Sequence, residues 1–194
     1  MGDETPHRKK KYLMTYVFIG PPASGKGTQA KLLAQKLKGR FYSIGALLRK
    51  RAENDPALSE TINNGRFASL TIVRELLNTL AKQDHGKNMV IDGSVRSPAQ
   101  ARDILKYWPH DDLRFILLDI PDEEIIRRAS HRLENNQPRQ DDKISVVKRR
   151  IKAYRHSLKP ILAILQNSNI KIIFIEGIGS VDAIHRKIVK LVHD

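Results

Sequence analysis

The sequence predicts an α/β fold in which helices cover both faces of a parallel β-sheet. Short apolar segments of strand length alternate along the chain with longer segments in which apolar residues recur at helical spacing. Strands separated by helices in this way form βαβ units, whose strands run parallel and are buried on both faces. The length of 194 residues corresponds to one domain, at about 150 residues per domain. We therefore expect a single α/β domain.

Four segments are predicted to be buried strands because they are apolar and end in turn-forming residues. They span residues 12–19, 89–91, 113–120 and 171–175. The chain is expected to turn sharply after the first strand, at residues 20–22, and after the second, at Asp92-Gly93.

Helices are predicted where apolar residues return every three or four positions. They span residues 25–37, 102–108, 144–165 and 181–192, and another begins at 121–124, where proline and acidic residues suit a helix N-terminus. We expect Pro160 to kink the long third helix and residues 135–142 to form a polar loop. Residues 44–80 are almost wholly helical, with breaks at Asp55-Pro56 and at 63–65, so a helical insertion is expected over one end of the sheet.

The composition excludes several classes of protein. The chain has 35 Lys and Arg against 21 Asp and Glu, a net charge of +14. This charge indicates an anionic partner, either nucleic acid, an acidic membrane surface or phosphorylated metabolites. The absence of cysteine excludes disulfides and thiolate metal sites. No apolar run is long enough to cross a bilayer and residues 1–12 do not resemble a signal peptide, so we expect a soluble, cytoplasmic protein.

The strongest motif is a glycine-rich loop between the first strand and the helix after it, which reads GPPASGKGT over residues 20–28. Such a loop turns successive N–H groups toward an anion, and the helix dipole adds to the attraction. Lys26 would reach the β- and γ-phosphates of a nucleotide, while Gly25 and Gly27 let the backbone approach them. Thr28 stands one place later than the Ser or Thr of the general motif. The alternative is a plain strand-to-helix turn capped by Ser24.

The GKGTQ ending of this loop resembles that of the adenylate kinases and related nucleoside monophosphate kinases. The resemblance continues in chain order to the C-terminus: YSIGALLR at 42–49 is similar to the family's STGDxLR, and DGSVR at 92–96 to its DGFPR. It implies a P-loop NTPase-like kinase domain over 12–194, preceded by a basic tail at 1–11. It also implies a helical insertion at about 43–72 that binds the nucleoside monophosphate (NMP), and a short lid at about 132–142.

The resemblance further implies which residues bind each ligand. ATP, the phosphoryl donor, would be bound by Gly20, Pro21, Pro22, Ala23, Ser24, Gly25, Lys26, Gly27, Thr28, Gln29, Arg128, Arg132, Gly177 and Ile178. The acceptor NMP would be bound by Ser43, Ile44, Arg49, Phe67, Ala68, Gly93, Arg96, Gln100, Arg139 and Arg150. Mg²⁺ would be held by Thr28 and Asp92, through water.

Several arginines have the spacing of the family's lid. Arg128 and Arg132 lie at i and i+4 and so share one helix face. Catalysis would depend on Lys26, Arg96, Arg128, Arg132, Arg139, Asp141 and Arg150, with Asp141 orienting the lid arginines. No zinc is expected, because the zinc-carrying lid needs about thirty residues and a ligand set. The remaining basic residues of this region are expected on a solvated face: Arg127, Lys143, Lys148, Lys152 and Arg155.

Gln100 favours AMP as acceptor, because it falls where adenylate kinases carry a base-binding glutamine. Ile44 stands where the family's adenine-binding threonine would be, and Ala46, Ser94 and Val95 also depart from the family pattern. We therefore expect a monomeric enzyme that catalyses ATP + AMP = 2 ADP and does not bind membranes, with nucleic acid a partner that the net charge leaves open. A UMP/CMP kinase or another small-molecule P-loop kinase is the first alternative. The second is a regulatory or RNA-associated nucleotide-binding protein with little kinase activity.

Overall fold

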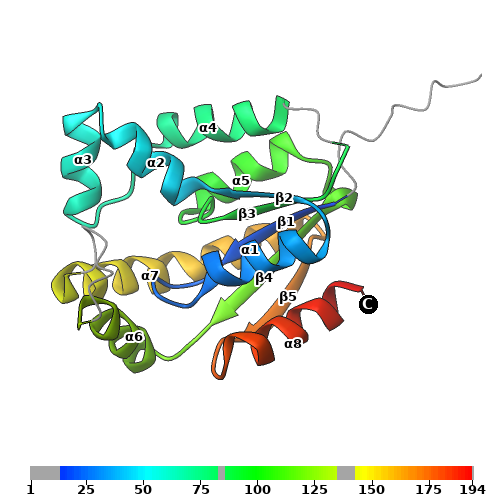
Figure 1. The fold of residues 1–194 in the computed structure, drawn as a ribbon. Coiled ribbons are helices and arrows are strands. Elements are labelled where there is room, and N and C mark those ends of the chain that lie inside the picture. The colour runs from blue at the N-terminus through cyan, green and yellow to red at the C-terminus, as the bar shows by residue number, and fades with distance from the viewer. Residues whose placement is uncertain (1–13, 83–85, 135–142, 194) are drawn as a thin grey trace, which may run out of the picture.

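The computed structural model describes residues 14–82, 86–134 and 143–193. A five-stranded parallel sheet lies at its centre (Figure 1), with strand order β2-β3-β1-β4-β5. The strands are β1 (Thr15–Ile19), β2 (Arg40–Ser43), β3 (Met89–Asp92), β4 (Leu113–Asp119) and β5 (Lys171–Glu176). The predicted α/β fold with a parallel sheet is confirmed.

Helices cover both faces of the sheet, as predicted. They are α1 (Lys26–Lys36), α2 (Ile44–Ala52), α3 (Pro56–Asn63), α4 (Leu70–Lys82), α5 (Pro98–Tyr107), α6 (Asp122–Glu134), α7 (Ile144–Asn167) and α8 (Val181–His193), with a 3-10 turn at His110–Asp112. Pro160 lies inside α7 without ending it. No helix among the described residues is both long and apolar enough to cross a membrane.

Alternate residues of β1 face opposite sides of the sheet, because side chains in a strand alternate with a period of two. Val17 and Ile19 pack with α4, α5 and α7 in one hydrophobic cluster. Tyr16 and Phe18 pack with α1 and α8 in another. Every residue of β1 is buried for this reason, which explains why its sequence reads as a continuous apolar run.

Strand β2 was not predicted from the sequence. This strand has only four residues and lies at the edge of the sheet, where Arg40 is exposed. Four residues give too short a pattern to be distinguished from a loop. Its register places Ser43 opposite Asp92, so α2 begins at the carboxyl edge of the sheet.

The segment predicted to be helical, residues 44–80, forms α2, α3 and α4, which we call the insertion, and its breaks occur where they were predicted. The side chain of Ser43 caps α2 by accepting from the N–H of Ala46. Asp55 caps α3 in the same way through Leu58 at 2.9 Å, and Pro56 occupies the first turn. In Figure 1, α2 and α3 lie on one side of the carboxyl ends of the strands, and α6 with the start of α7 lies on the other.

Candidate active site

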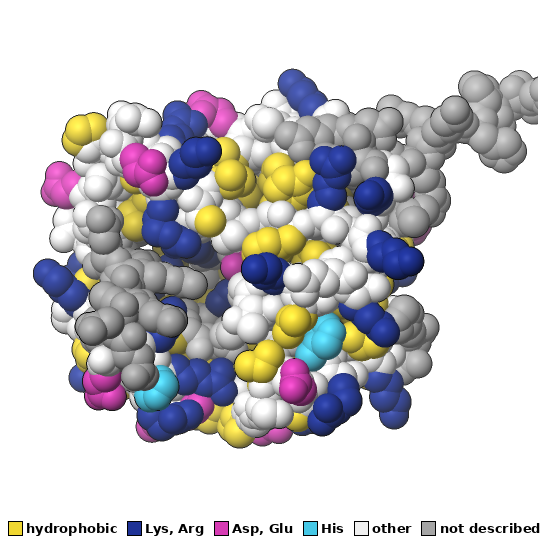
Figure 2. Space-filling view, viewed as in Figure 1, with side chains coloured by type: hydrophobic (Ala, Val, Ile, Leu, Met, Phe, Trp, Pro, Cys, Tyr) yellow, Lys and Arg dark blue, Asp and Glu magenta, His cyan; other side chains and the backbone are white. Residues whose placement is uncertain are grey.

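A cavity of about 1460 Å³ opens at the carboxyl ends of the strands, between the insertion and α6. Figure 2 shows the molecule hollowed there, with Lys and Arg side chains around the hollow. Sites for a single small molecule rarely exceed about 1,000 Å³, so this cavity has room for two ligands of nucleotide size. We call the part formed by residues 20–29, α6 and the turn before α8 the loop side, and the part formed by α2, α3 and α4 the insertion side.

Most of the predicted site residues line this cavity. They are Gly20, Pro22, Ala23, Ser24, Gly25, Lys26, Gly27, Thr28, Gln29, Ser43, Arg49, Phe67, Asp92, Gly93, Arg96, Arg128, Arg132, Arg150 and Ile178. Pro21, Ile44, Ala68, Gln100 and Gly177 do not line it. Arg139 and Asp141 lie outside the described residues.

The glycine-rich loop has a backbone that ordinary residues rarely adopt. Gly25 has a φ of 89° and Ala23 a φ of 56°, both in the left-handed region. Gly20 is required by a close approach, because a Cβ there would lie 2.3 Å from the carbonyl oxygen of Leu118. Among the described residues, no side chain caps α1, so Ser24 is not the capping residue that the alternative interpretation required. The loop and the first turn of α1 line the cavity.

Lys26 lies over the loop that it follows. Its ammonium Nζ donates to the carbonyl oxygen of Pro21 at 2.5 Å and to Ser24 Oγ at 3.3 Å. This places a positive charge against the backbone that is predicted to bind an anion.

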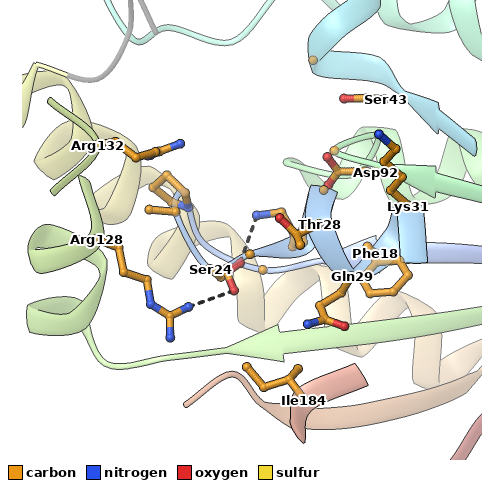
Figure 3. A pocket seen from close by; sticks show the side chains of 18 of the residues that line it. Phe18, Ser24, Thr28, Gln29, Lys31, Ser43, Asp92, Arg128, Arg132 and Ile184 are labelled. Atoms are coloured by element: carbon orange, nitrogen blue, oxygen red, sulfur yellow. Dashed lines mark hydrogen bonds between the residues drawn. The ribbon is translucent and has the colours of Figure 1, made fainter. Parts of the chain in front are cut away.

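Arg128 joins three parts of the loop side. Its guanidinium donates to the Ser24 carbonyl at 3.3 Å (Figure 3), to the Gly177 carbonyl at 2.8 Å and to Glu124 at 2.6 Å. Hydrogen bonds from Arg127 and Arg128 lower the pKa of Glu124 from 4.5 to about 2. The glycine-rich loop, α6 and the turn before α8 are thereby held together by one side chain.

Gln29 also connects elements of the loop side. Its side chain is buried, and its amide Nε2 donates to the carbonyl oxygen of Val181, the first residue of α8, at 2.9 Å. This residue was predicted to bind ATP, and it lines the cavity while also fixing the start of α8 against α1.

On the insertion side, Arg49 and Arg96 point toward the same place. A Cβ on Gly45 would lie 3.4 Å from Arg49 Nη1 and 3.4 Å from Arg96 Nη2, and one on Gly93 would lie 3.3 Å from Arg96 Nη2. The two glycines therefore make room for both guanidinium groups. Arg150 lines a small second cavity with these two arginines, so three cations from α2, the β3–α5 turn and α7 come together.

Asp92 has the features expected of a residue near a cation. Its Oδ1 is buried and has no hydrogen-bond partner among the described residues. Its Oδ2 would lie 3.2 Å from a Cβ on Gly27, so the carboxylate faces the first turn of α1, near Thr28 (Figure 3). In the described part of the chain, no group of three His, Asp or Glu side chains could hold a metal ion. A cation here would need oxygen atoms from water or from a ligand in addition.

The predicted residues outside the cavity have other partners. Ile44 is only 1% exposed and belongs to the hydrophobic core, and Ala68 packs against that core. Gln100 is buried at the start of α5, and its Oε1 accepts from the backbone N–H of Arg96 at 2.7 Å. The Gly177 carbonyl binds Arg128, and a Cβ on Gly177 would lie 2.7 Å from Ile120. None of these four residues lines the cavity.

The cavity is also lined by residues that were not predicted from the sequence, among them two charged ones, Glu124 and Lys31. Glu124 lies four residues before Arg128 on α6, and the i, i+4 rule could have indicated this pair. Lys31 lines the cavity near Ser43 and Asp92 (Figure 3), and only the tertiary structure brings it there.

The expectation that Arg155 lies on a solvated face is wrong. Its side chain is about one-third exposed, and its guanidinium donates to Asp119, to Asp122 and to the carbonyl oxygen of Ile120. Lys143, Lys148 and Lys152 are exposed as predicted, and Arg127, although 69% exposed, is paired with Glu124.

Comparisons with known proteins agree with this geometry. Residues 18–170 match the family model described as "Adenylate kinase". The chain is 29% identical to an adenylate kinase of Thermus thermophilus, covering 89% of this chain and 93% of that protein. It is 33% identical to an adenylate kinase of Synechococcus sp., covering 87% and 92%. It is also 26% identical to the Arabidopsis thaliana protein named "Probable UMP-CMP kinase 2", covering 96% and 72%.

Proposed function

The chain belongs to the adenylate kinase family of phosphotransferases, and from this premise we propose that it transfers the γ-phosphoryl group of ATP reversibly to AMP. The observation that carries the proposal is the meeting of two sets of cations in one cavity. Lys26, Arg128 and Arg132 surround the loop side, and Arg49, Arg96 and Arg150 surround the insertion side. A nucleotide phosphate on each side would bring a donor and an acceptor face to face.

This reaction needs no general base, because the attacking oxygen of the acceptor phosphate is already ionised. The protein must align the two phosphates, stabilise the charge that spreads over the transferred group, and exclude water. On the loop side, the N–H groups at the start of α1 and the ammonium of Lys26 would hold the β- and γ-phosphates of ATP. Arg132, which projects from α6 into the cavity, would contact the group in transfer (Figure 3).

On the insertion side, the guanidinium groups over Gly45 and Gly93 would clamp the acceptor phosphate. A planar guanidinium can donate two parallel hydrogen bonds to phosphate oxygens, which explains arginine rather than lysine at both positions. Arg150, on α7, would contact the same phosphate from the opposite wall of the cavity.

Mg²⁺ fits this site, because the unpartnered oxygen of Asp92 supplies a buried acceptor beside Thr28. Asp92 and Thr28 would hold the ion through water, and its positive charge, together with that of Lys26, would offset the negative charge of the β- and γ-phosphate oxygens. We also propose that the protein acts as a monomer, as the resemblance to the family implies.

Two observations bear on the acceptor base. Gln100 stands at the base-binding position of the family, and its carbonyl oxygen is engaged by the backbone of Arg96. Phe67 lines the cavity 5.7 Å from the guanidinium carbon of Arg96, where its ring could pack against a base. The similarity to a plant UMP-CMP kinase makes CMP and UMP the second candidate acceptors.

A coupled ADP-release assay with ATP and Mg²⁺ tests the proposal, with AMP, CMP, UMP and GMP offered in turn. We expect fast turnover with AMP and much slower turnover with the others. Turnover with CMP or UMP instead of AMP would show that the acceptor is a pyrimidine nucleotide. No turnover with any of the four would refute the proposed reaction.

The role of Gln100 has its own test. Gln100→Ala removes the hydrogen bond from the Arg96 N–H and should raise the KM for AMP. If the side chain also recognises the base, the preference for AMP over CMP and UMP should narrow as well. A Gln100→Ala protein that keeps its preference for AMP would refute the assignment of Gln100 to base recognition.

A further inference from the structure

Arg155 connects α7 to the point where the chain leaves the sheet and begins α6. Its Nη1 donates to Asp119 at 2.8 Å, its Nη2 to the carbonyl oxygen of Ile120 at 2.7 Å, and its Nε to Asp122 at 3.0 Å. Asp119 ends β4 and Asp122 begins α6, so the three acceptors lie within four consecutive residues. One planar side chain therefore joins a central strand and two helices.

The two helices that it joins carry arginines of the cavity. Arg128 and Arg132 lie on α6, and Arg150 lies on α7, five residues before Arg155. Apolar contacts among Ile125, Ala129, Val147 and Ile151 also pack these helices together. Such packing has no preferred direction, whereas hydrogen bonds from a rigid guanidinium do.

A small rotation of α6 about its first turn would displace Arg132, which lies near the other end of the helix. Arg132 lies ten residues after Asp122, about 15 Å along the helix axis, so a rotation of about 4° displaces it by about 1 Å. A displacement of about 1 Å in a positioning group is enough to lower a rate by about 100-fold.

We propose that Arg155 is a positioning residue that sets the angle between α6 and α7 and thereby aligns Arg128 and Arg132 with Arg150. The proposal rests on the proposed function for its kinetic consequence only, because the angle between the helices can be measured without turnover. Asp119 and Asp122 are 45% and 46% exposed in this cluster, and exposed ion pairs add little to stability. The contribution of Arg155 is therefore to geometry more than to the free energy of unfolding.

A second arginine of the chain provides a matched control. Arg74 on α4 pairs with Asp103 on α5 at 2.8 Å, and Asp103 is only 4% exposed. Neither residue lines the cavity. Removing Arg74 leaves a buried carboxylate without its partner, so Arg74→Gln should lower stability more than Arg155→Gln does.

The experiment compares wild type, Arg155→Gln, Arg155→Lys and Arg74→Gln by turnover with ATP and AMP and by thermal unfolding. We expect Arg155→Gln to lower kcat by about 10- to 100-fold with KM values within about threefold. Arg155→Lys, which keeps the charge but not the planar fork, should have an intermediate kcat and remains informative if Arg155→Gln folds poorly. Arg74→Gln should have a lower Tm and a kcat within about twofold of wild type. A wild-type kcat in both Arg155 variants, or an equal loss of kcat in Arg74→Gln, would overturn the proposal.

A distance measurement separates this inference from the proposed function. The chain has no cysteine, so Glu134→Cys on α6 and Lys159→Cys on α7 would give two unique, exposed sites for nitroxide labels. The distance distribution between the labels should broaden or shift in Arg155→Gln and stay unchanged in Arg74→Gln. An unchanged distribution in Arg155→Gln refutes the inference, even if the wild-type protein turns over no nucleotide.

Discussion

The loop side and the insertion side of the cavity hold their cations in different ways. On the loop side, Lys26 and Arg128 donate to backbone carbonyls of residues that follow the strands, so the edge of the sheet itself fixes them. On the insertion side, Arg49 and Arg96 lie over two glycines, in space that other side chains would fill. The loop-side cations are positioned by residues next to the sheet, whereas the geometry of the insertion side depends on how α2, α3 and α4 pack.

The insertion is anchored where it meets α7. Arg149 of α7 donates to the carbonyl oxygen of Asn64 at 2.5 Å. Gly65 has a φ of 69°, and a Cβ there would lie 2.6 Å from Val146. Because the position of the insertion depends on this contact with α7, a substitution at the contact can alter the insertion side without changing any of its arginines. This difference between the two sides leads to predictions of decreasing size.

The largest effect is expected on the loop side, at Arg132. Arg132→Ala should lower kcat by about 1,000-fold, because an arginine that stabilises charge in phosphoryl transfer contributes on that scale. Steady-state kinetics with ATP and AMP measure it, with Lys148→Ala, an exposed position on α7, as the control that should behave as wild type. An Arg132→Ala protein with kcat within threefold of wild type would contradict the assigned role.

A smaller effect, restricted to one substrate, is expected on the insertion side. Arg49→Ala should raise the KM for AMP by about 10- to 100-fold, through the loss of charge-assisted hydrogen bonds to the acceptor phosphate. The KM for ATP should stay within about threefold. Lys50→Ala changes the next residue, which is exposed, and should change neither constant. Equal increases in the KM for AMP and the KM for ATP would show that Arg49 does not act on the acceptor site alone.

The anchor of the insertion is predicted to contribute to stability. Gly65→Ala should lower the free energy of unfolding by about 1–3 kcal/mol, from the positive φ and the overlap with Val146. Gly86→Ala is a matched control, because Gly86 also has a positive φ, of 50°, but no atom of the described residues lies within 4 Å of where its Cβ would be. Urea unfolding of both variants measures how much of the lost free energy of unfolding is due to the overlap with Val146. Equal losses of this free energy in the two variants would show that the contact with Val146 contributes nothing.

The smallest effect concerns the pH dependence of stability at Glu124. Its pKa of about 2 in the folded protein lies below its ordinary value of 4.5, so its stabilising contribution is complete above pH 4.5 and is lost as pH falls toward 2. Glu124→Gln should therefore be less stable than wild type at neutral pH, by on the order of 1 kcal/mol after screening by solvent. The difference should shrink between pH 4.5 and 2. Thermal unfolding at a series of pH values tests this, and a difference that is constant with pH would refute it.

Local patterns predicted much of the fold, because each depends on neighbouring residues. The buried strands β1 and β4 were recognised from continuous apolar runs, and the breaks around α3 from Asp55-Pro56 and from Asn63 to Gly65. The edge strand β2 was missed, because four residues with one exposed arginine carry no periodic signal. The glycine-rich loop needed only its own residues and its position between a strand and a helix.

The α/β class, the glycine-rich loop and the identity of the cations follow from spacing and residue type within short segments, so they could be predicted from the residues alone. Which cations meet depends on the tertiary structure. It brought Arg49, Arg96 and Arg150 together from elements far apart in the chain, and buried Ile44 and Gln100 behind the cavity rather than in its wall. The tertiary structure also pairs Arg155 with Asp119 and Asp122, which was not predicted from its place among many basic residues. The physical reason is that a guanidinium acts through what lies within hydrogen-bond reach, and distance across a fold is set by packing between elements, not by separation along the chain.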